Sequence, residues 1–275
     1  MINLPTFEMG NHIPKLIHQT FPNKTHLPSD IEKNISSICT MNPNWKYCMY
    51  DDTDIETTIL KYYNLELLQI YKKINPAYGA ARADFFRYLL MYAVGGVYLD
   101  IKGSVKKPFD EILLPEDRYI LSHWDKPHLG NHPGLRGFDE YQQWHIITVK
   151  GHPFLRRIIE RVIDNIQNYN IFKFGIGKKG VLKLTGPIPY TLVIMELKHA
   201  YPFRQVESIQ EFGLIYSIYQ SYAHKNHRKF FKKHYSKLKR PIVFQPNFKS
   251  RCICTLFYLV YLIKLPIRKL IKLTS

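Results

Sequence analysis

Short apolar runs alternate with longer amphipathic stretches along the first third of the chain. Residues 15–21 (KLIHQTF) and 45–50 (WKYCMY) predict strands, since short runs of apolar and aromatic residues bounded by turn residues are typical of strands. Ser29 and Thr53 each precede a helical pattern, and a Glu follows each of them three residues later. This spacing is the signature of a capping box, so a helix is predicted to begin at each position.

The same alternation continues to about residue 200. Residues 79–93 predict a helix that stops at Gly95-Gly96, and VYLDI at 97–101 predicts a strand directly after it. Amphipathic helices are predicted at 153–168 and 187–199. Because helices and strands alternate, the pattern indicates one α/β domain with helices on the faces of a sheet.

Length and charge narrow the picture further. The chain has 275 residues, enough for one large α/β domain with a full hydrophobic core. Its formal net charge is +17, and it contains 20 Tyr and 16 Phe. A strongly basic protein attracts polyanions such as nucleic acid, an anionic membrane or a phosphorylated substrate, and composition alone does not choose among them.

The cysteines and the N-terminus bear on the compartment. The four cysteines form no CxxC pair and no zinc-binding spacing, so a reducing environment is favoured over a disulfide framework. The first fifteen residues show no basic segment followed by an apolar run, and no signal peptide is expected. The expected location is cytoplasmic, peripheral at a membrane. The cysteines are Cys39, Cys48, Cys252 and Cys254.

The C-terminal part differs in character from the rest. Residues 225–251 are densely basic, and 252–263 (CICTLFYLVYLI) carry no charge. Twelve residues are too few to span a bilayer as a helix, which needs roughly 20. We therefore expect a domain at 1–245 and a basic amphipathic tail at 246–275 that lies on an anionic membrane surface. A helix packed on the domain is the alternative interpretation.

The stretch ADFFRYLLMYAVGGVYLDIK, at 83–102, carries the candidate chemistry. Asp84 and Arg87 are three residues apart and share one face of the predicted helix. Asp100 stands where the next strand ends, and ligands of α/β sheets bind outside the carboxyl ends of strands. Carboxylate and guanidinium groups are suited to hold sugar hydroxyls. A structural ion pair on the helix is the alternative for Asp84 and Arg87.

This segment resembles glycosyltransferase family 32, the DXD-containing transferases that include fungal Golgi mannosyltransferases and bacterial capsular-polysaccharide transferases. The resemblance lies in Asp84-Phe85-Phe86-Arg87-Tyr88 followed by Gly95-Gly96-Val97-Tyr98-Leu99-Asp100. Further matching motifs follow in the family's order along most of the chain: IPKLIHQTF (13–21), NPNWKYCMYDD (42–52), GHPF (151–154) and TGP (185–187).

The resemblance implies a GT-A-like nucleotide-binding domain with a mixed sheet flanked by helices, followed here by the basic, apolar helical tail. It also implies retaining transfer of a hexose from a UDP- or GDP-linked donor to a glycan or lipid-linked acceptor, as in surface polysaccharide synthesis. Asp84, Arg87 and Asp100 are then the catalytic candidates. The substrate-binding candidates are Phe21, which would stack on the base, Gln19, Tyr98, Lys102 and His224.

The family motif is broken at its second carboxylate. Position 102 is Lys, so the motif reads Asp100-Ile101-Lys102. A charged lysine cannot bind Mn²⁺ or Mg²⁺. Either Asp100 holds a divalent metal with other ligands, or Lys102 itself neutralises the diphosphate, or the protein is an inactive sugar-nucleotide-binding module. Lys102 pointing into solvent would leave a metal site intact.

Other candidates have simpler interpretations. Asp52-Thr53-Asp54 is the chain's literal D-x-D, but it opens a helix, where Asp caps the first turn. His18 is expected to be structural. His128 and His132 are expected in a loop, because Gly130 and Pro133 argue against a helix. A basic nucleic-acid-binding protein is the alternative from another class, but no nucleic-acid-binding signature is present and no such partner is expected.

Overall fold

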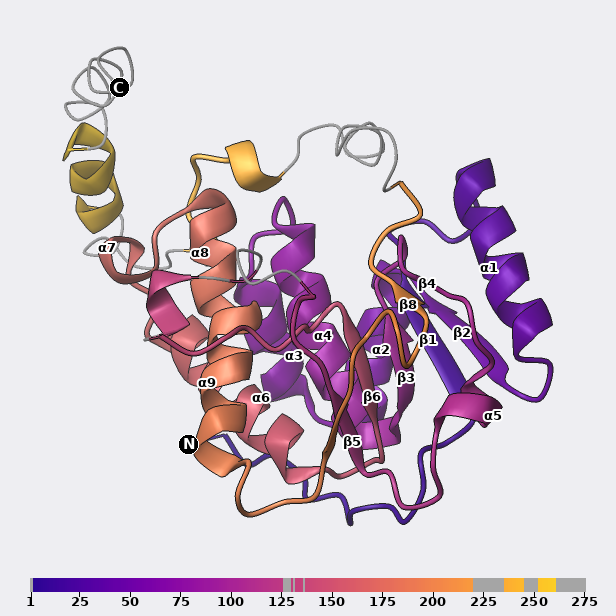
Figure 1. The fold of residues 1–275 in the computed structure, drawn as a ribbon. Coiled ribbons are helices and arrows are strands. Elements are labelled where there is room, and N and C mark those ends of the chain that lie inside the picture. The colour runs from indigo at the N-terminus through magenta and orange to yellow at the C-terminus, as the bar shows by residue number, and fades with distance from the viewer. Residues whose placement is uncertain are drawn as a thin grey trace, which may run out of the picture.

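The computed structural model describes residues 2–125, 130, 132–135, 137–219, 235–244 and 252–260. Its first half alternates strands and helices as the sequence predicts (Figure 1). The elements are β1 (Leu16–Thr20), α1 (Ser29–Met41), β2 (Lys46–Tyr50), α2 (Asp52–Tyr62), α3 (Leu65–Lys73), α4 (Gly79–Val94) and β3 (Gly96–Leu99).

The second half is richer in helices and has shorter strands. The predicted helices at 153–168 and 187–199 are confirmed as α6 and α9, and several short elements surround them. These elements are β4 (Ser104–Val105), α5 (Phe109–Ile112), β5 (Tyr119–Leu121), β6 (His145–Thr148), α6 (Pro153–Gln167), α7 (Ile171–Phe174), α8 (Gly177–Leu184), α9 (Pro187–Leu197), β7 (Arg204–Gln205) and β8 (Leu214–Ile215).

The main sheet is mixed, as expected. Within the described residues it has the order β2-β1-β3-β6-β5-β7, and a small second sheet pairs β4 with β8. Strands β2, β1 and β3 run parallel, whereas β6 is antiparallel to both of its neighbours. The carboxyl ends of β1, β2 and β3 therefore lie along one edge, with His18 opposite both Cys48 and Tyr98.

Each face of the sheet is covered by its own hydrophobic core. Val97 and Leu99 point into a core with α1 and α5, and Tyr98 points into a larger core with α3, α4, α6, α8 and α9. This alternation is that of a strand whose two faces are both covered. Helix α4 is buried nearly all round, because it lies against the sheet and α6 and also contacts α2 and α8. Figure 1 shows this helical layer on one side of the sheet and α1 on the other.

The helix starts correct two details of the sequence interpretation. Helix α1 begins at Ser29, but its N-cap is Pro28 and no side chain caps it, so the capping box from Ser29 to Glu32 is wrong. Helix α2 is capped two residues earlier than expected. The Asp51 side chain accepts hydrogen bonds from the backbone N–H groups of Thr53 and Asp54, and the Asp54 side chain accepts one from the backbone N–H of Asp51. An extended Asp51 caps better than Thr53, which lies inside the first turn. The literal D-x-D is thus part of a cap.

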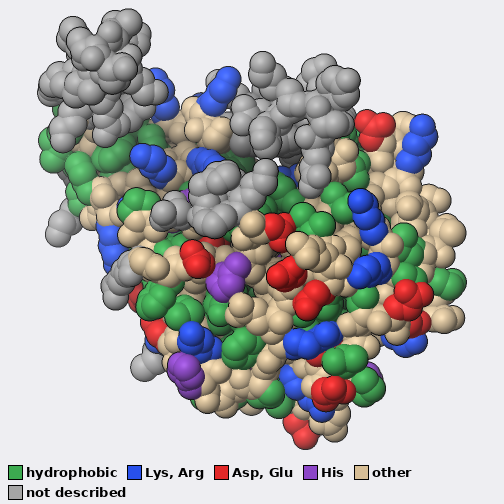
Figure 2. All heavy atoms as spheres, viewed as in Figure 1, with side chains coloured by type: hydrophobic (Ala, Val, Ile, Leu, Met, Phe, Trp, Pro, Cys, Tyr) green, Lys and Arg blue, Asp and Glu red, His purple; other side chains and the backbone are tan. Residues whose placement is uncertain are grey.

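The surplus positive charge is unevenly distributed along the chain. Residues 220–275 contain fourteen Lys and Arg residues and no Asp or Glu, so most of the net charge of +17 comes from there. On the face shown in Figure 2, acidic and basic side chains are interspersed, and several acidic ones gather near the middle. Among the side chains coloured in this view, the two signs of charge are therefore mixed.

Part of the expected tail is described as a helix, at residues 252–260. Phe257 packs edge-on against Phe172 of α7 with ring centroids 5.2 Å apart, and Cys254 is buried. Leu256 and Leu259 are each 55% exposed. None of the helices in the described ranges has the length and apolarity that crossing a bilayer requires. All four cysteines are free thiols.

Candidate functional site

The turn between α4 and β3 brings Arg87 and Asp100 together. Gly95 has φ 74°, and a Cβ atom there would lie 2.5 Å from the backbone nitrogen of Lys150, so the position requires glycine. From Arg87 to Gly95 the helix rises about 12 Å, at 1.5 Å per residue. From Gly96 to Asp100 the strand returns about 13 Å, at roughly 3.3 Å per residue. The two side chains therefore meet across the turn.

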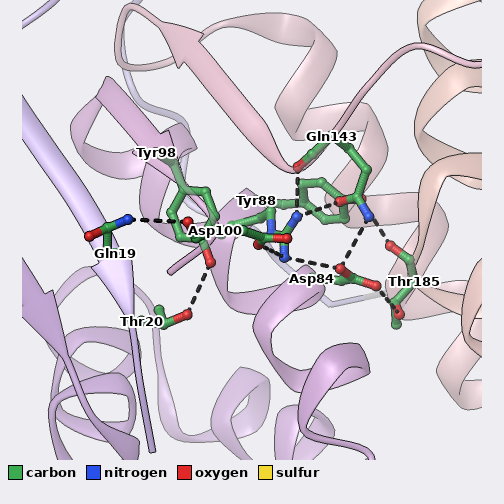
Figure 3. A network of polar contacts seen from close by, with 9 residues as sticks. Gln19, Thr20, Asp84, Tyr88, Tyr98, Asp100, Gln143 and Thr185 are labelled. Carbon is green, nitrogen blue, oxygen red and sulfur yellow. Dashed lines mark hydrogen bonds and ion pairs between the residues drawn. The ribbon is translucent and has the colours of Figure 1, made fainter. Parts of the chain in front are cut away.

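An ion cluster joins the three predicted catalytic residues. The Nη2 atom of Arg87 lies 2.7 Å from Oδ1 of Asp100 and 3.2 Å from Oδ1 of Asp84. The side chains of Asp84 and Arg87 are 7% and 4% exposed, whereas that of Asp100 is 27% exposed. Of the three, only Asp100 is therefore accessible to a ligand without rearrangement. Figure 3 shows Asp84 and Asp100 pointing toward one another.

Two further elements complete the cluster. Gln143, just before β6, accepts from Arg87 Nη1 at 3.0 Å and donates to Oδ1 of Asp84 at 3.2 Å. Its Oε1 also accepts from the Tyr88 hydroxyl at 2.9 Å. Thr185, at the end of α8, donates its hydroxyl to Oδ2 of Asp84 at 3.1 Å. These hydrogen bonds thus connect helix α4, the residues just before β6 and the C-terminal end of α8 at one point (Figure 3).

Burial and charge act in opposite directions on the cluster. Burial raises the pKa of Asp84, and the Arg87 charge with the hydrogen bonds from Gln143 and Thr185 works against that rise. Burial alone would lower the pKa of Arg87, but the Asp100 and Asp84 charges outweigh it and raise the pKa overall. Arg87 therefore stays cationic. Its Nε has no hydrogen-bond partner among the described residues, which is rare for a buried donor.

The predicted binding residues Gln19 and Tyr98 are buried behind Asp100. Gln19 Nε2 donates to the backbone oxygen of Asp100 at 3.1 Å, and Tyr47 donates to its Oε1 at 2.7 Å. The Tyr98 ring lies 4.9 Å from the Arg87 guanidinium, and its hydroxyl is 3.0 Å from Oγ1 of Thr20. Both side chains are essentially inaccessible, so they position Asp100 and Arg87 rather than face a cleft.

Phe21 and Asp100 lie on the same edge of the sheet. Phe21 directly follows β1, and its backbone N–H donates to Tyr50 at the end of β2. The β1–β3 register pairs His18 with Tyr98, which sets Thr20 beside the start of the Asp100 turn. Phe21 is half-buried, and it follows β1 at the edge where α/β sheets bind ligands.

His18 fits the structural interpretation. It is buried in β1 between Gly95 and Tyr50, with Nε2 3.1 Å from the Gly95 oxygen and Nδ1 3.1 Å from the Tyr50 hydroxyl. A neutral ring that donates from Nε2 and accepts at Nδ1 satisfies both contacts. Burial lowers the pKa of His18 to about 4, so the ring is neutral at physiological pH.

The Lys102 side chain contacts an aromatic ring. Its Nζ lies over the Tyr216 ring, 3.8 Å from the centroid, and the ring itself is half-buried. Of the alternatives for Lys102, one left the side chain solvated at the strand end; in the structure its ammonium lies against a ring instead of being surrounded by water alone. Tyr216 in turn packs edge-on against Trp124 and Trp144.

The donor set around Asp100 does not fit a divalent metal. Oδ1 of Asp100 is bound by Arg87, and the turn that follows Asp100 carries the ammonium group of Lys102. Asp84 has its two oxygens bound by Arg87, Gln143 and Thr185. In the described part of the chain, no three His, Cys, Asp or Glu side chains gather as a potential metal-binding group.

The remaining histidine candidates are His128, His132 and His224, and the structure describes one of them. His224 and His128 lie outside the described residues. His132 lies just before a 3-10 turn at Pro133–Leu135, and its Nε2 is 2.8 Å from the buried carboxylate of Glu140. It is therefore a loop residue in polar contact with Glu140, and α-helical zinc-ligand spacing does not apply to it.

Sequence reasoning missed Gln143, Thr185 and Tyr216. Thr185 opens the TGP motif, which the sequence places in family order without giving it a role. Gln143 and Tyr216 carry no local signal, because each reaches the site only through the three-dimensional arrangement of non-consecutive segments.

Comparison with known proteins adds to this geometry. A family model described as a glycosyltransferase sugar-binding region containing a DXD motif matches residues 28–119. The initiation-specific alpha-1,6-mannosyltransferase of Schizosaccharomyces pombe is 28% identical over 206 residues, covering 69% of this chain and 50% of that protein. Inositol phosphoceramide mannosyltransferase 2 of the same yeast is 30% identical over 190 residues, covering 69% and 48%.

The chain spans about half the length of the curated relatives it matches. Among solved structures, the UDP-bound glycosyltransferase domain from the YGT toxin is similar, with a TM-score of 0.52 at 9% identity. The alignment covers 78% of this chain and 83% of that domain, and it establishes a GT-A-type fold. Motif order, family model and fold agree, and the chain belongs to glycosyltransferase family 32.

Proposed function

We propose that the chain is a retaining glycosyltransferase that moves a hexose from a UDP- or GDP-linked donor to a glycan or lipid-linked acceptor in surface polysaccharide synthesis. The observation that carries the proposal is the Asp84–Arg87–Asp100 cluster at the carboxyl end of β3, with Asp100 open to solvent. A buried, charged cluster costs desolvation free energy that a purely structural contact rarely needs. Its position at a strand end is where a donor would bind.

Each residue of the cluster has a separate role in this proposal. Asp100 accepts hydrogen bonds from hydroxyls of the donor. Arg87 and Asp84 are buried behind Asp100 and hold it in place, and a donor oxygen would reach the unpartnered Nε of Arg87 only after the enclosing residues rearrange. Phe21, at the end of the neighbouring strand, stacks on the nucleotide base.

Retention is proposed to follow a front-face path. A double displacement needs a free carboxylate as nucleophile; both oxygens of Asp84 already accept hydrogen bonds or ion pairs, and Asp100 is assigned here to the donor hydroxyls. In a front-face path the departing diphosphate guides the acceptor hydroxyl to the same face of the sugar. The rule that carboxylate spacing predicts stereochemistry belongs to glycosidases and does not apply here.

The relatives suggest which sugar and acceptor to test first. Both yeast relatives are named mannosyltransferases, which supports mannose as the transferred hexose. One of them is named for inositol phosphoceramide, a lipid, which supports a lipid-linked acceptor. An anionic membrane surface is the proposed site of action, with the exposed Leu256 and Leu259 of the tail facing it.

The test is a donor screen with the full chain. We expect one of the UDP- or GDP-sugars to raise the melting temperature, because a ligand that binds the native state stabilises it. The same donor should then label a lipid-linked acceptor in a transfer assay, with the product anomer read by NMR. Binding without transfer or donor hydrolysis would support the inactive-module alternative. Absence of any stabilisation by either series would contradict the proposal.

A further inference from the structure

Lys102 is fixed within one turn of Asp100. The Gly103 N–H donates to the Asp100 oxygen at 2.6 Å, which closes a tight turn over residues 100–103. The Lys102 carbonyl accepts from the Ile218 N–H at 2.9 Å, and β4 pairs with β8 just beyond. Two backbone segments therefore fix the backbone from which the Lys102 side chain extends, two residues after Asp100.

An aromatic cluster holds the ammonium end. Nζ lies 3.8 Å from the Tyr216 centroid, within the range of a cation–π contact. Tyr216 is braced edge-on by Trp124 and Trp144, with centroids 5.0 and 5.6 Å away. The Trp144 carbonyl accepts from the Asp100 N–H at 2.7 Å, which ties this cluster to the same strand end.

The charge of Lys102 is not neutralised by a carboxylate within the described ranges. The ion pairs of that region join Arg87 to Asp84 and Asp100, and the contact of Lys102 is the Tyr216 ring. A ring quadrupole holds a cation without cancelling its charge. The residue two positions after Asp100 thus carries a positive charge that is held by a ring and has no ion-pair partner among the described carboxylates, and such a charge attracts a phosphate group.

We propose that Lys102 binds the diphosphate of the nucleotide-sugar donor and stabilises it as leaving group, in place of a divalent cation. The proposal rests on the proposed transferase function for its reaction step. In that step the bond between the sugar C1 and the diphosphate oxygen breaks, and its electron pair stays on the diphosphate. The acceptor oxygen bonds to C1, and its proton passes to the diphosphate. Lys102 stays protonated and supplies only charge.

The test measures nucleotide binding, so it does not depend on turnover. UDP, UMP, GDP and GMP are titrated calorimetrically into the full chain in excess EDTA. We expect one diphosphate to bind more tightly than its monophosphate. Lys102→Met should weaken that diphosphate about 10- to 100-fold, the size of a lost charge-assisted hydrogen bond, and leave the monophosphate unchanged. Lys106→Met, at an exposed lysine after β4, is the matched control and should change neither.

Two further variants separate charge from position. Tyr216→Phe keeps the ring and should keep diphosphate affinity, whereas Tyr216→Ala should lose part of it. Lys102→Asp should bind the diphosphate only when Mn²⁺ is added, since it provides a second carboxylate near Asp100. Circular dichroism and melting temperature confirm that each variant is folded.

The outcomes are distinguishable. Wild-type binding that disappears in EDTA and returns with Mn²⁺ would overturn this proposal, as would equal affinities for wild type and Lys102→Met. Either result leaves the proposed function intact. Tight, metal-independent diphosphate binding that Lys102→Met weakens would support it even if no transfer is detected. A wild type that binds neither UDP nor GDP would overturn both proposals.

Discussion

Asp100 and Arg87 form a 2.7 Å ion pair across a turn that joins a buried helix directly to a buried strand. The pair is asymmetric, because Arg87 is enclosed and Asp100 is about a quarter exposed. Arg87 also holds Asp84, on the preceding turn of the same helix. One cation therefore pairs with a buried carboxylate and with an accessible one. Because of this difference in burial, we expect substitutions of Asp84 and Asp100 to affect stability differently.

Asp100→Asn should reduce turnover strongly and stability little. The amide keeps the shape of the side chain and remains partly solvated, but it loses the charge that faces the donor. We expect turnover to fall on the order of 100-fold, as when one charged or polar contact to the reacting group is removed. The melting temperature and transfer rate are measured together. Near-wild-type transfer by this variant would show that the site is wrongly assigned.

Asp84→Asn should reduce both turnover and the stability of the fold. The substitution leaves the buried Arg87 with Asp100 as its single ionised partner. The new amide has only one acceptor oxygen, so it cannot accept from both Gln143 and Thr185. We expect the free energy of unfolding to fall by about 1–3 kcal/mol along with turnover. Urea unfolding measures the free energy of unfolding, and a transfer assay measures turnover. A variant as stable as wild type would mean that Asp84 is not held as the structure indicates.

Thr185→Val isolates one hydrogen bond of the cluster. Valine matches threonine in shape but cannot donate to Oδ2 of Asp84, which is bound at 3.1 Å in a fully buried position. A hydrogen bond to a charged group contributes about 1.5–3 kcal/mol. We expect the free energy of unfolding to fall by that amount. Thr185→Ser, which keeps the hydroxyl, is the control and should lose less; equal losses would contradict this reading.

Much of the architecture was predictable because its signals are local. Gly95 and Gly96 end α4 and begin β3 with no intervening loop, and helix and strand rises alone place Arg87 opposite Asp100. The predicted cap of α2 was two residues away from the observed one. Asp51, Asp52 and Asp54 all suit an N-cap, and the backbone conformation decides among them. Propensity cannot resolve such near-equivalent choices.

The rest of the site depended on segments far apart in the sequence. Gln143 lies 56 residues from Arg87, and Thr185 lies 101 residues from Asp84. Lys102 alone suggests a solvated side chain or a lost metal ligand. Its cation–π contact with Tyr216 becomes visible only when β4 and β8 pair. Periodicity does not report such long-range polar contacts, because a single Gln or Tyr in a loop has no pattern.

Acidification should destabilise the fold between about pH 6.5 and 4. Burial lowers the pKa of His18 and His152 to about 4 and that of His145 to about 3. In this window the unfolded chain binds more protons than the folded one, so the free energy of unfolding falls as pH falls. Each such histidine contributes a slope of up to about 1.4 kcal/mol per pH unit.

His152→Asn tests one of these contributions. His152 caps α6 through the Phe154 N–H, and Asn is also a good cap, so the variant removes the titrating ring and keeps the cap. Urea unfolding at a series of pH values should give a shallower slope than wild type. His12→Asn, at an exposed position, is the control for the loss of one histidine. An identical slope for His152→Asn would rule out its contribution.

Membrane binding should depend on two exposed leucines of the tail helix. Leu256 and Leu259 are each 55% exposed, whereas their neighbour Cys254 is buried against the domain. Replacing both leucines with Ser should therefore spare the fold and remove apolar area that would enter the lipid interface. At about 1.5–3 kcal/mol per buried leucine, affinity for anionic vesicles should fall at least tenfold.

The measurement is co-sedimentation with vesicles of phosphatidylcholine containing anionic phosphatidylserine, compared with phosphatidylcholine alone. Leu65→Ser is the control, because Leu65 is 60% exposed at the start of α3 and lies outside the tail. It should sediment like wild type. Raising the salt concentration should weaken wild-type binding if the fourteen basic residues of 220–275 contribute to it, because salt screens the attraction between basic side chains and anionic headgroups. If the double variant sedimented as fully as wild type, the leucines would not be the membrane contact.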